Sequence, residues 1–176
     1  MPPNGRLYPM SRVTVVVANP QIASQAVCLR ILRQEKGIRA VTEALTESEI
    51  VEASARLKPR ILLLNDGLLS GNGVPLLSII REKSPETKVI VVSNLDSEIL
   101  MLKALLLGAR GYLTIKDLPA FLAKSVRKVD AGEVWVPRKM VASIINFLTQ
   151  FSPRGDRAFI RRRTNDALPN SCEVAI

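Results

Sequence analysis

Short apolar runs alternate along most of the chain with longer segments in which apolar residues recur every three or four positions. A continuous apolar run is typical of a strand buried on both faces, and the longer period is typical of a helix. The pattern predicts five strands, over residues 12–18, 38–42, 60–64, 88–93 and 111–114. It predicts a helix after each strand, over residues 21–36, 49–57, 73–83, 97–107 and 118–129.

Capping signals support several of the predicted helix ends. Thr46 and Glu49 have the spacing of a capping box, in which each side chain hydrogen-bonds the backbone N–H of the other residue. Asp117 is the predicted N-cap of the helix over 118–129. Gly37 and Gly132 are expected just after helix ends, where glycine adopts a left-handed backbone at no steric cost.

The alternation of strands and helices predicts an α/β fold, a doubly wound five-stranded parallel sheet with helices on both faces. A further helix is predicted over residues 138–151, where apolar residues recur at helical spacing. We expect residues 11–133 to form the α/β domain and residues 134–151 to form a linker and dimerisation helix. Residues 152–176 are expected to be a flexible basic tail.

Composition narrows the possible chemistry. The chain has 176 residues, a net charge of +9 and no histidine, which excludes Ser–His and Cys–His catalysis and histidine-ligated metals. Cys28 and Cys172 lie far apart and have no metal or redox spacing, so a reducing compartment is expected. No signal peptide or membrane span is recognisable. We therefore expect a soluble, cytoplasmic protein without a membrane partner.

The residues that follow the strands are the candidates for a functional site, because ligands bind at the carboxyl ends of parallel strands. A site for phosphate and Mg²⁺ needs converging carboxylates, a hydroxyl and a lysine. The chain offers Asp66, Ser93 and Lys116. After the first strand it has Asn19 and Pro20, which read as an N-cap followed by proline at the first helical position. No metal site is therefore predicted.

Several stretches together resemble a bacterial response-regulator receiver domain, which has the CheY-like, flavodoxin-like fold. The most specific is GARGYL at residues 108–113, followed by Lys116 and Asp117. Residues 88–93 and 59–73 support it, and AGEVWVP at 131–137 is similar to the segment that joins receivers to an output domain. The chain is most similar to receivers of NarL/LuxR-type transcription regulators, over residues 12–139.

The resemblance implies a phosphoacceptor Asp after the third strand, two acidic residues after the first that hold Mg²⁺, a Ser or Thr after the fourth and a Lys after the fifth. In this chain these positions fall on Asn65, on Asn19 and Pro20, on Ser93, and on Ile115 with Lys116 one residue later. Only Ser93 matches, so the phosphorylation site is degenerate. Ser93, Tyr112 and Lys116 are the positions of the switch that the resemblance implies.

We therefore expect a pseudo-receiver, a regulatory module of a two-component-type transcription regulator that acts through protein–protein contacts, is not an enzyme and needs no cofactor. One alternative is a receiver that uses Asp66 as a displaced acceptor, with Mg²⁺. Strand alternation points Asp66 away from the direction of Asn65, so this alternative needs a register slip. Another is a small flavodoxin-like protein that binds a nucleotide or flavin, although the chain lacks a glycine-rich fingerprint and clustered acids.

The helix predicted over residues 97–107 is apolar nearly all round. Leu102 and Leu105, together with Met101, are expected to supply its core face, which leaves Ile99 and Leu106 flanking Lys103 on the opposite face. Exposed aliphatic groups of this kind mark a partner surface, so these three residues are a predicted homodimer interface. The alternative is that the helix over 138–151 covers them.

The expected partners follow from the same resemblance. A sensor kinase or another regulatory protein would contact the domain, and DNA would be bound only through an output domain absent from this chain. Residues 168–176 resemble the opening of a NarL/LuxR-type DNA-binding domain, and no recognition helix follows.

Overall fold

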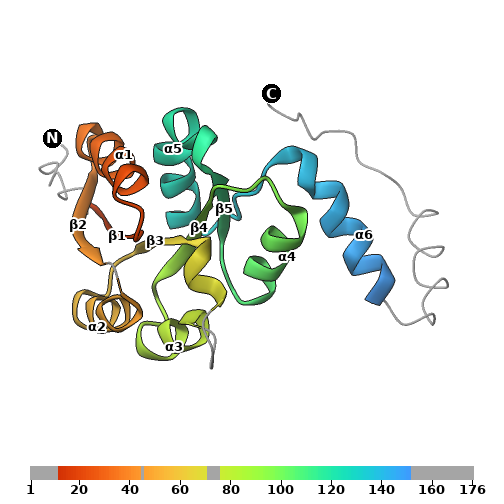
Figure 1. Ribbon diagram of the computed structural model, residues 1–176, viewed down its shortest axis with the longest axis horizontal. Coiled ribbons are helices and arrows are strands. Elements are labelled where there is room, and N and C mark those ends of the chain that lie inside the picture. Colours follow the sequence, from red (N-terminus) through yellow and green to blue (C-terminus); the bar gives the residue numbers. More distant parts are fainter. Residues whose placement is uncertain (1–11, 45, 71–75, 152–176) are drawn as a thin grey trace, which may run out of the picture. The chain divides into compact units, whose positions relative to one another are not determined.

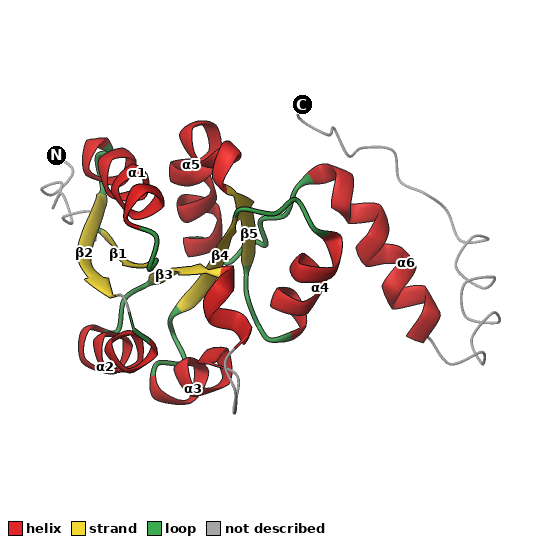
Figure 2. Cartoon of the chain, in the orientation of Figure 1, coloured by secondary structure: helices red, strands yellow, loops and turns green. Residues whose placement is uncertain are grey.

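The computed structural model describes residues 12–44, 46–70 and 76–151. Its centre is a five-stranded parallel sheet in the order β2-β1-β3-β4-β5 (Figure 2). The strands are β1 (Val13–Ala18), β2 (Ile38–Ala44), β3 (Ile61–Asn65), β4 (Lys88–Ser93) and β5 (Gly111–Thr114). The reversal of strand order beside β1 makes the sheet doubly wound, so the predicted α/β fold is confirmed.

Helices cover both faces of this sheet. They are α1 (Ile22–Gln34), α2 (Glu47–Leu57), α3 (Leu76–Lys83), α4 (Glu98–Leu106) and α5 (Leu118–Asp130). Figure 1 shows α1 and α5 on one face and α2 and α3 on the other, with α4 beside β5. The predicted start of α3 near Gly73 lies outside the described residues. No helix in the described ranges is long and apolar enough to cross a membrane.

The core is aliphatic, as expected from a chain with few aromatic residues. On the α1 and α5 side, Val15 of β1 and Ile90 of β4 pack in one buried cluster with Leu122 and Val126 of α5. All four side chains are fully buried. Their burial supplies the main driving force for folding and fixes the strand ends that carry the candidate site.

Several predicted helix ends are confirmed. The Thr46 hydroxyl accepts from the Glu49 N–H, and the Glu49 carboxylate accepts from the Thr46 N–H, which completes the capping box of α2. Gly37 and Gly132 have positive φ values of 82° and 98°. Asp117 is the N-cap residue of α5, as predicted, but its side chain makes no capping hydrogen bond, and its Oδ2 accepts from Thr114 Oγ1 at 2.5 Å. The turn that carries Asp117 is a separate 3₁₀ helix, Ile115–Asp117.

The prediction that Asn19 caps α1 is wrong. The helix begins at Ile22 with Gln21 as its N-cap, so Pro20 precedes the first helical residue. Asn19 Oδ1 instead accepts from the Gln21 N–H at 2.9 Å and closes a turn between β1 and α1. A turn of this kind competes with helix capping for the same side chain.

The segment after α5 returns to the edge of the sheet. Trp135 forms a parallel bridge with Gly111, and backbone hydrogen bonds link it to Arg110 and Tyr112. A short 3₁₀ helix, Arg138–Met140, and the helix α6, Val141–Phe151, follow. The chain divides into two compact units, Met1–Val141 and Ala142–Ile176. The tail expected over 152–176 lies outside the described residues.

Candidate functional site

The polar residues predicted at the strand ends do gather at one edge of the sheet. Ala18 pairs with Leu64, so Asn19 leaves β1 at the level where Asn65 ends β3. Ser93 ends β4 opposite Thr114 of β5. Asn19, Asn65, Ser93 and Thr114 are all buried, with at most 4 % of their surface exposed. The ends of the three central strands, β1, β3 and β4, therefore carry the neutral polar side chains of Asn19, Asn65 and Ser93.

Backbone donors occupy the amide oxygens of both asparagines. Asn65 Oδ1 accepts from the Gly67 N–H at 3.0 Å, as Asn19 Oδ1 does from Gln21. These bonds orient each amide so that its oxygen faces the backbone. Both Nδ2 groups are buried, and neither has a hydrogen-bond partner in the described part of the chain. The two amides thus offer N–H donors to the site, the reverse of what a cation requires.

The close turn after β3 depends on a residue without a side chain. A Cβ atom at Gly67 would lie 3.0 Å from Asn65 Oδ1, which is tighter than ordinary van der Waals contact. The absence of that carbon lets the Gly67 N–H reach the amide oxygen. Asn65 is therefore held in place by its own turn.

The expectation that Asp66 points away from the site is wrong. The strand ends at Asn65, and Asp66 begins the 3₁₀ helix η1 (Asp66–Ser70), so strand alternation does not apply to it. Asp66 Oδ2 accepts from Ser93 Oγ at 2.6 Å. A charge-assisted bond this short is among the stronger hydrogen bonds in proteins. Asp66 is the one carboxylate that the structure brings to Ser93 among the described residues.

Ser93 and Tyr112 both hold the loop before α4. Ser93 Oγ accepts from the Leu95 N–H at 2.9 Å, and the Tyr112 hydroxyl donates to the Leu95 carbonyl at 2.8 Å. The ring of Tyr112 is fully buried, and this burial raises the pKa of its phenol. Sequence reasoning assigned Ser93 and Tyr112 to a switch but gave no sign that they meet at the Leu95 backbone.

Lys116, the third predicted switch residue, lies elsewhere. Its Nζ pairs with Asp96 at 3.1 Å, and Lys139 pairs with the same carboxylate. The bonds from Lys139 and Lys116 lower the pKa of Asp96. Within the described residues, Lys116 forms no hydrogen bond or ion pair with Asp66 or Ser93. Sequence reasoning missed Asp96, since nothing in a local pattern identifies a partner far along the chain.

The residues present do not fit the Mg²⁺ ion that a receiver fold implies. Hard cations need several anionic or carbonyl oxygens, but the side-chain oxygens of Asn19 and Asn65 already accept from backbone N–H groups, and Pro20 has no side-chain oxygen. Asp66 supplies a single carboxylate beside Ser93. Within the described ranges, no three acidic, cysteine or histidine side chains cluster as a metal site.

The surface of α4 carries the exposed apolar residues that were predicted. Ile99 is 78 % exposed and Leu106 is 68 % exposed, and Lys103 between them is also exposed. Met101 is buried, as expected, and Ala104 is the other buried residue of this helix. Leu102 and Leu105, also expected on the core face, are only half-buried. The buried stripe therefore runs through Met101 and Ala104, one residue before the predicted Leu102 and Leu105, and the outer face of the helix stays apolar.

Comparison with known proteins identifies the fold and the family. The model of the response regulator receiver domain family matches residues 15–124. Oxygen regulatory protein NreC of Staphylococcus epidermidis is 27 % identical over 133 residues, which are 75 % of this chain and 61 % of that protein. NreC of Staphylococcus aureus (strain JH9) is 28 % identical over 134 residues, again 61 % of its length. The chain thus spans about three-fifths of these curated relatives.

Two solved structures share the fold. The receiver domain of NarL from Mycobacterium tuberculosis has a TM-score of 0.64 at 23 % identity, and the match covers 70 % of this chain and 99 % of that one. A LuxR-family two-component response regulator from Aurantimonas has a TM-score of 0.67 at 19 % identity, over 79 % and 99 %. These likenesses agree with the observed strand order, and the family match over residues 15–124 shows that the chain belongs to the response regulator receiver domain family.

Proposed function

We propose that this chain is a pseudo-receiver, a regulatory module of a NarL/LuxR-type transcription regulator that works without phosphorylation at the family's acceptor position. The observation that carries the proposal is the pair of amides at Asn19 and Asn65, whose oxygens are bound by backbone N–H groups. The side chain of Asn65 is an amide and has no carboxylate oxygen that could attack phosphorus, so Asn65 cannot form an acyl phosphate.

The missing cation site supports the same proposal. Phosphoryl transfer needs Mg²⁺ or several cationic groups to neutralise the charge of the transferred group. The buried Nδ2 groups of Asn19 and Asn65 are donors and cannot bind Mg²⁺, and Lys116 is engaged by Asp96. The proposed module is therefore not an enzyme, and it holds its regulatory state through contacts rather than through a covalent modification.

The exposed face of α4 is the proposed contact surface. Ile99, Lys103 and Leu106 lie one and two turns apart on one side of the helix. We propose that they form a homodimer interface in the cytoplasm. We further propose that DNA is bound through an output domain and that a sensor kinase or another regulatory protein is the upstream partner; this chain spans about three-fifths of the oxygen regulatory protein NreC.

A second candidate function rests on one hydrogen bond. Because Ser93 Oγ donates to Asp66 at 2.6 Å, Asp66 lies next to the hydroxyl that the family keeps beside its acceptor. On this view Asp66 is a displaced acceptor that takes a phosphoryl group with Mg²⁺ as cofactor. The nearest described cation of the switch, Lys116, is paired with Asp96 and not with Asp66, which weakens this candidate.

The two candidates are separated by intact mass after incubation with acetyl phosphate and Mg²⁺. The pseudo-receiver gives no phosphoryl adduct. A displaced acceptor gives an adduct that is lost in Asp66→Ala and kept in Asp96→Ala, a matched removal of an acidic side chain. An adduct with that pattern would overturn our first proposal. Thermal melting with added flavin or nucleotide tests the remaining flavodoxin-like alternative, because a ligand stabilises the protein that binds it.

A further inference from the structure

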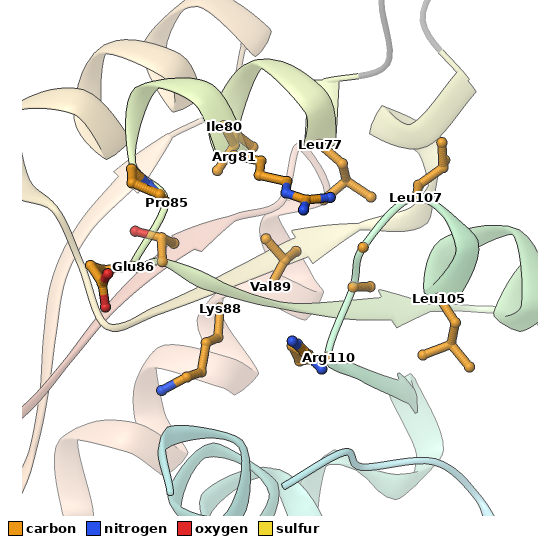
Figure 3. Close-up of a pocket in the computed structure, with 13 residues that line it drawn as sticks. Leu77, Ile80, Arg81, Pro85, Glu86, Lys88, Val89, Leu105, Leu107 and Arg110 are labelled. Carbon is orange, nitrogen blue, oxygen red and sulfur yellow. The ribbon is translucent and has the colours of Figure 1, made fainter. Parts of the chain in front are cut away.

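A pocket lies at the opposite end of β4 from Ser93, between α3 and the connection from α4 to β5 (Figure 3). Its volume is about 380 Å³, near the lower end of the range for small-molecule sites. Its lining includes Val89 at the start of β4, whereas Ser93 ends that strand. The pocket is therefore separate from the degenerate acceptor site.

The floor of the pocket is apolar. Leu77 and Ile80 of α3, Val89 of β4 and Ala109 after α4 all line it, and each is buried. Apolar atoms that already line a hollow gain contacts when a compact hydrocarbon fills it. These side chains give an aliphatic group a small apolar contact surface inside a pocket whose accessible lining is mostly polar.

Two arginines flank this floor. Arg81 projects from α3 and Arg110 from the loop before β5, and Figure 3 shows them on either side of Val89. Neither guanidinium has an ion-pair or hydrogen-bond partner within the part of the chain that the structure describes. The carboxylate that lines the pocket, Glu86, lies toward its other end, beside Lys88 (Figure 3). The positively charged side chains of Arg81 and Arg110 therefore flank Val89, and the Glu86 carboxylate does not lie between them (Figure 3).

Lys88 does not add to this pair. Its Nζ donates to the Asp130 carbonyl at 2.9 Å, so only its stem lines the pocket. The chemistry of the site is set by two planar guanidinium groups. Guanidinium binds the two oxygens of a carboxylate or phosphate side by side, which an ammonium cannot do.

The walls of the pocket are fixed by hydrogen bonds that need no ligand. The Arg110 N–H donates to the Val89 carbonyl at 2.7 Å, and the Trp135 N–H donates to the Arg110 carbonyl at 3.0 Å. On the other wall, Thr87 Oγ1 donates to the Pro59 carbonyl at 2.6 Å. A pocket built on rigid backbone loses little conformational freedom when a ligand binds.

Helix electrostatics account for only part of this arrangement. Arg81 lies in the last turn of α3, where a cation complements the exposed carbonyl groups. Arg110 lies beyond the end of α4, whose last carbonyls already accept from Leu107, Gly108 and Ala109. Capping therefore does not explain Arg110, nor the apolar hollow between the two arginines.

We propose that this pocket binds a small organic anion, a carboxylate or phosphate group on a compact aliphatic body. The anion lies between Arg81 and Arg110, and the aliphatic part lies on Val89 and its apolar neighbours. Binding there needs neither Asn65 nor Asp66, so it supplies a route for a chemical signal that does not pass through phosphorylation.

The test uses octanoate, octyl phosphate and uncharged octanol as probes of the full chain, followed by amide NMR shifts. We expect at least one of the two anions to shift the signals of Val89 and Ala109, with octanol much weaker. The preferred headgroup tells carboxylate from phosphate. Arg81→Gln and Arg110→Gln should each weaken binding roughly tenfold, because each removes a charge-assisted hydrogen bond. Arg30→Gln on the exposed side of α1 is the matched control and should not weaken it.

Three results overturn the proposal. One is that neither anion moves these signals, and another is that octanol moves them equally. A third is that the Arg81 and Arg110 variants bind like the Arg30 control. If a glutamate-rich peptide binds at these arginines while both small anions fail, the pocket belongs to a protein interface and the small-ligand proposal is wrong.

Discussion

The Ser93 hydroxyl lies 2.6 Å from Asp66 Oδ2 and donates to it, which joins the end of β4 to the first residue after β3. Ser93 Oγ also accepts from the Leu95 N–H, and the Leu95 carbonyl accepts from the hydroxyl of the buried Tyr112. The loop that leads to α4 is therefore held from two strands at one residue. A change at Asp66 has a direct path of hydrogen bonds to the start of α4.

Replacing Ser93 with alanine tests the strength of this connection. The substitution leaves the Asp66 carboxylate and the Leu95 N–H without their partner. We expect the free energy of unfolding to fall by about 1–3 kcal/mol, the usual loss for a bond to a charged group. Urea unfolding measures it, with Ser78→Ala on the exposed side of α3 as a control within about 0.5 kcal/mol. Equal effects of the two variants would show that the bond adds no stability.

Restoring carboxylates tests the proposal that the acceptor position is not phosphorylated because it lacks a nucleophile and a cation site. Asn65→Asp alone supplies a nucleophile but leaves Asn19 and Pro20 without anionic oxygens for Mg²⁺. We expect a phosphoryl adduct with acetyl phosphate only when Asn65→Asp is combined with Asn19→Asp and Pro20→Asp. Intact mass after the same incubation decides it. An adduct on the single variant would mean that the missing cation site is not what blocks phosphorylation.

The features that sequence reasoning predicted well are those set by local residues. The capping box of Thr46 and Glu49 depends on residues three positions apart, and the five strands depend on continuous apolar runs. The candidate site was only partly predictable. Asp66 was misplaced because strand alternation was extended one residue past the end of β3. The Lys116–Asp96 pair could not be foreseen, because the topology alone brings the β4–α4 and β5–α5 connections together.

The ion pairs that Asp96 forms with Lys116 and Lys139, here called the Asp96 clamp, predict how the stability of the protein depends on pH. Lys139 and Lys116 lower the pKa of Asp96 below its value in the unfolded chain. The clamp therefore contributes stability above the unfolded pKa, about 4, and loses it as pH falls through the lower folded value. Asp96→Asn should flatten the fall of the urea midpoint in acid. Glu52→Gln, an exposed acid on α2, should leave that slope unchanged, and a wild-type slope in Asp96→Asn would contradict the assignment.

Cys28 is expected to be inert in the folded protein. Its side chain is buried, and desolvation raises the pKa of its thiol to about 11. Because the thiolate is the reactive form, iodoacetamide should label Cys28 slowly at pH 8 and rapidly in urea. Peptide mass analysis reads the labelling at that position. Since ionisation occurs first in the unfolded chain, Cys28 also favours unfolding as pH rises above about 9. Labelling at equal rates in both states would contradict the buried placement.

Charged substitutions on the exposed face of α4 test the homodimer proposal. Ile99 and Leu106 are seven residues apart, about two helical turns, so they share one side of the helix with Lys103 between them. Ile99→Glu and Leu106→Glu should convert a dimer to a monomer by light scattering, since each places a charge in an apolar contact.

A substitution of Lys103 distinguishes a dimer formed through α4 from a dimer formed through another surface. In a symmetric dimer centred on α4, two Lys103 ammonium groups approach one another, so Lys103→Ala should keep or tighten the dimer. Val134→Glu is the matched control, because Val134 is 51 % exposed and lies after α5. If the α4 variants remain dimeric while Val134→Glu dissociates, the chains meet through the segment after α5. If the wild-type chain is a monomer at every concentration tested, the apolar face of α4 serves a different partner.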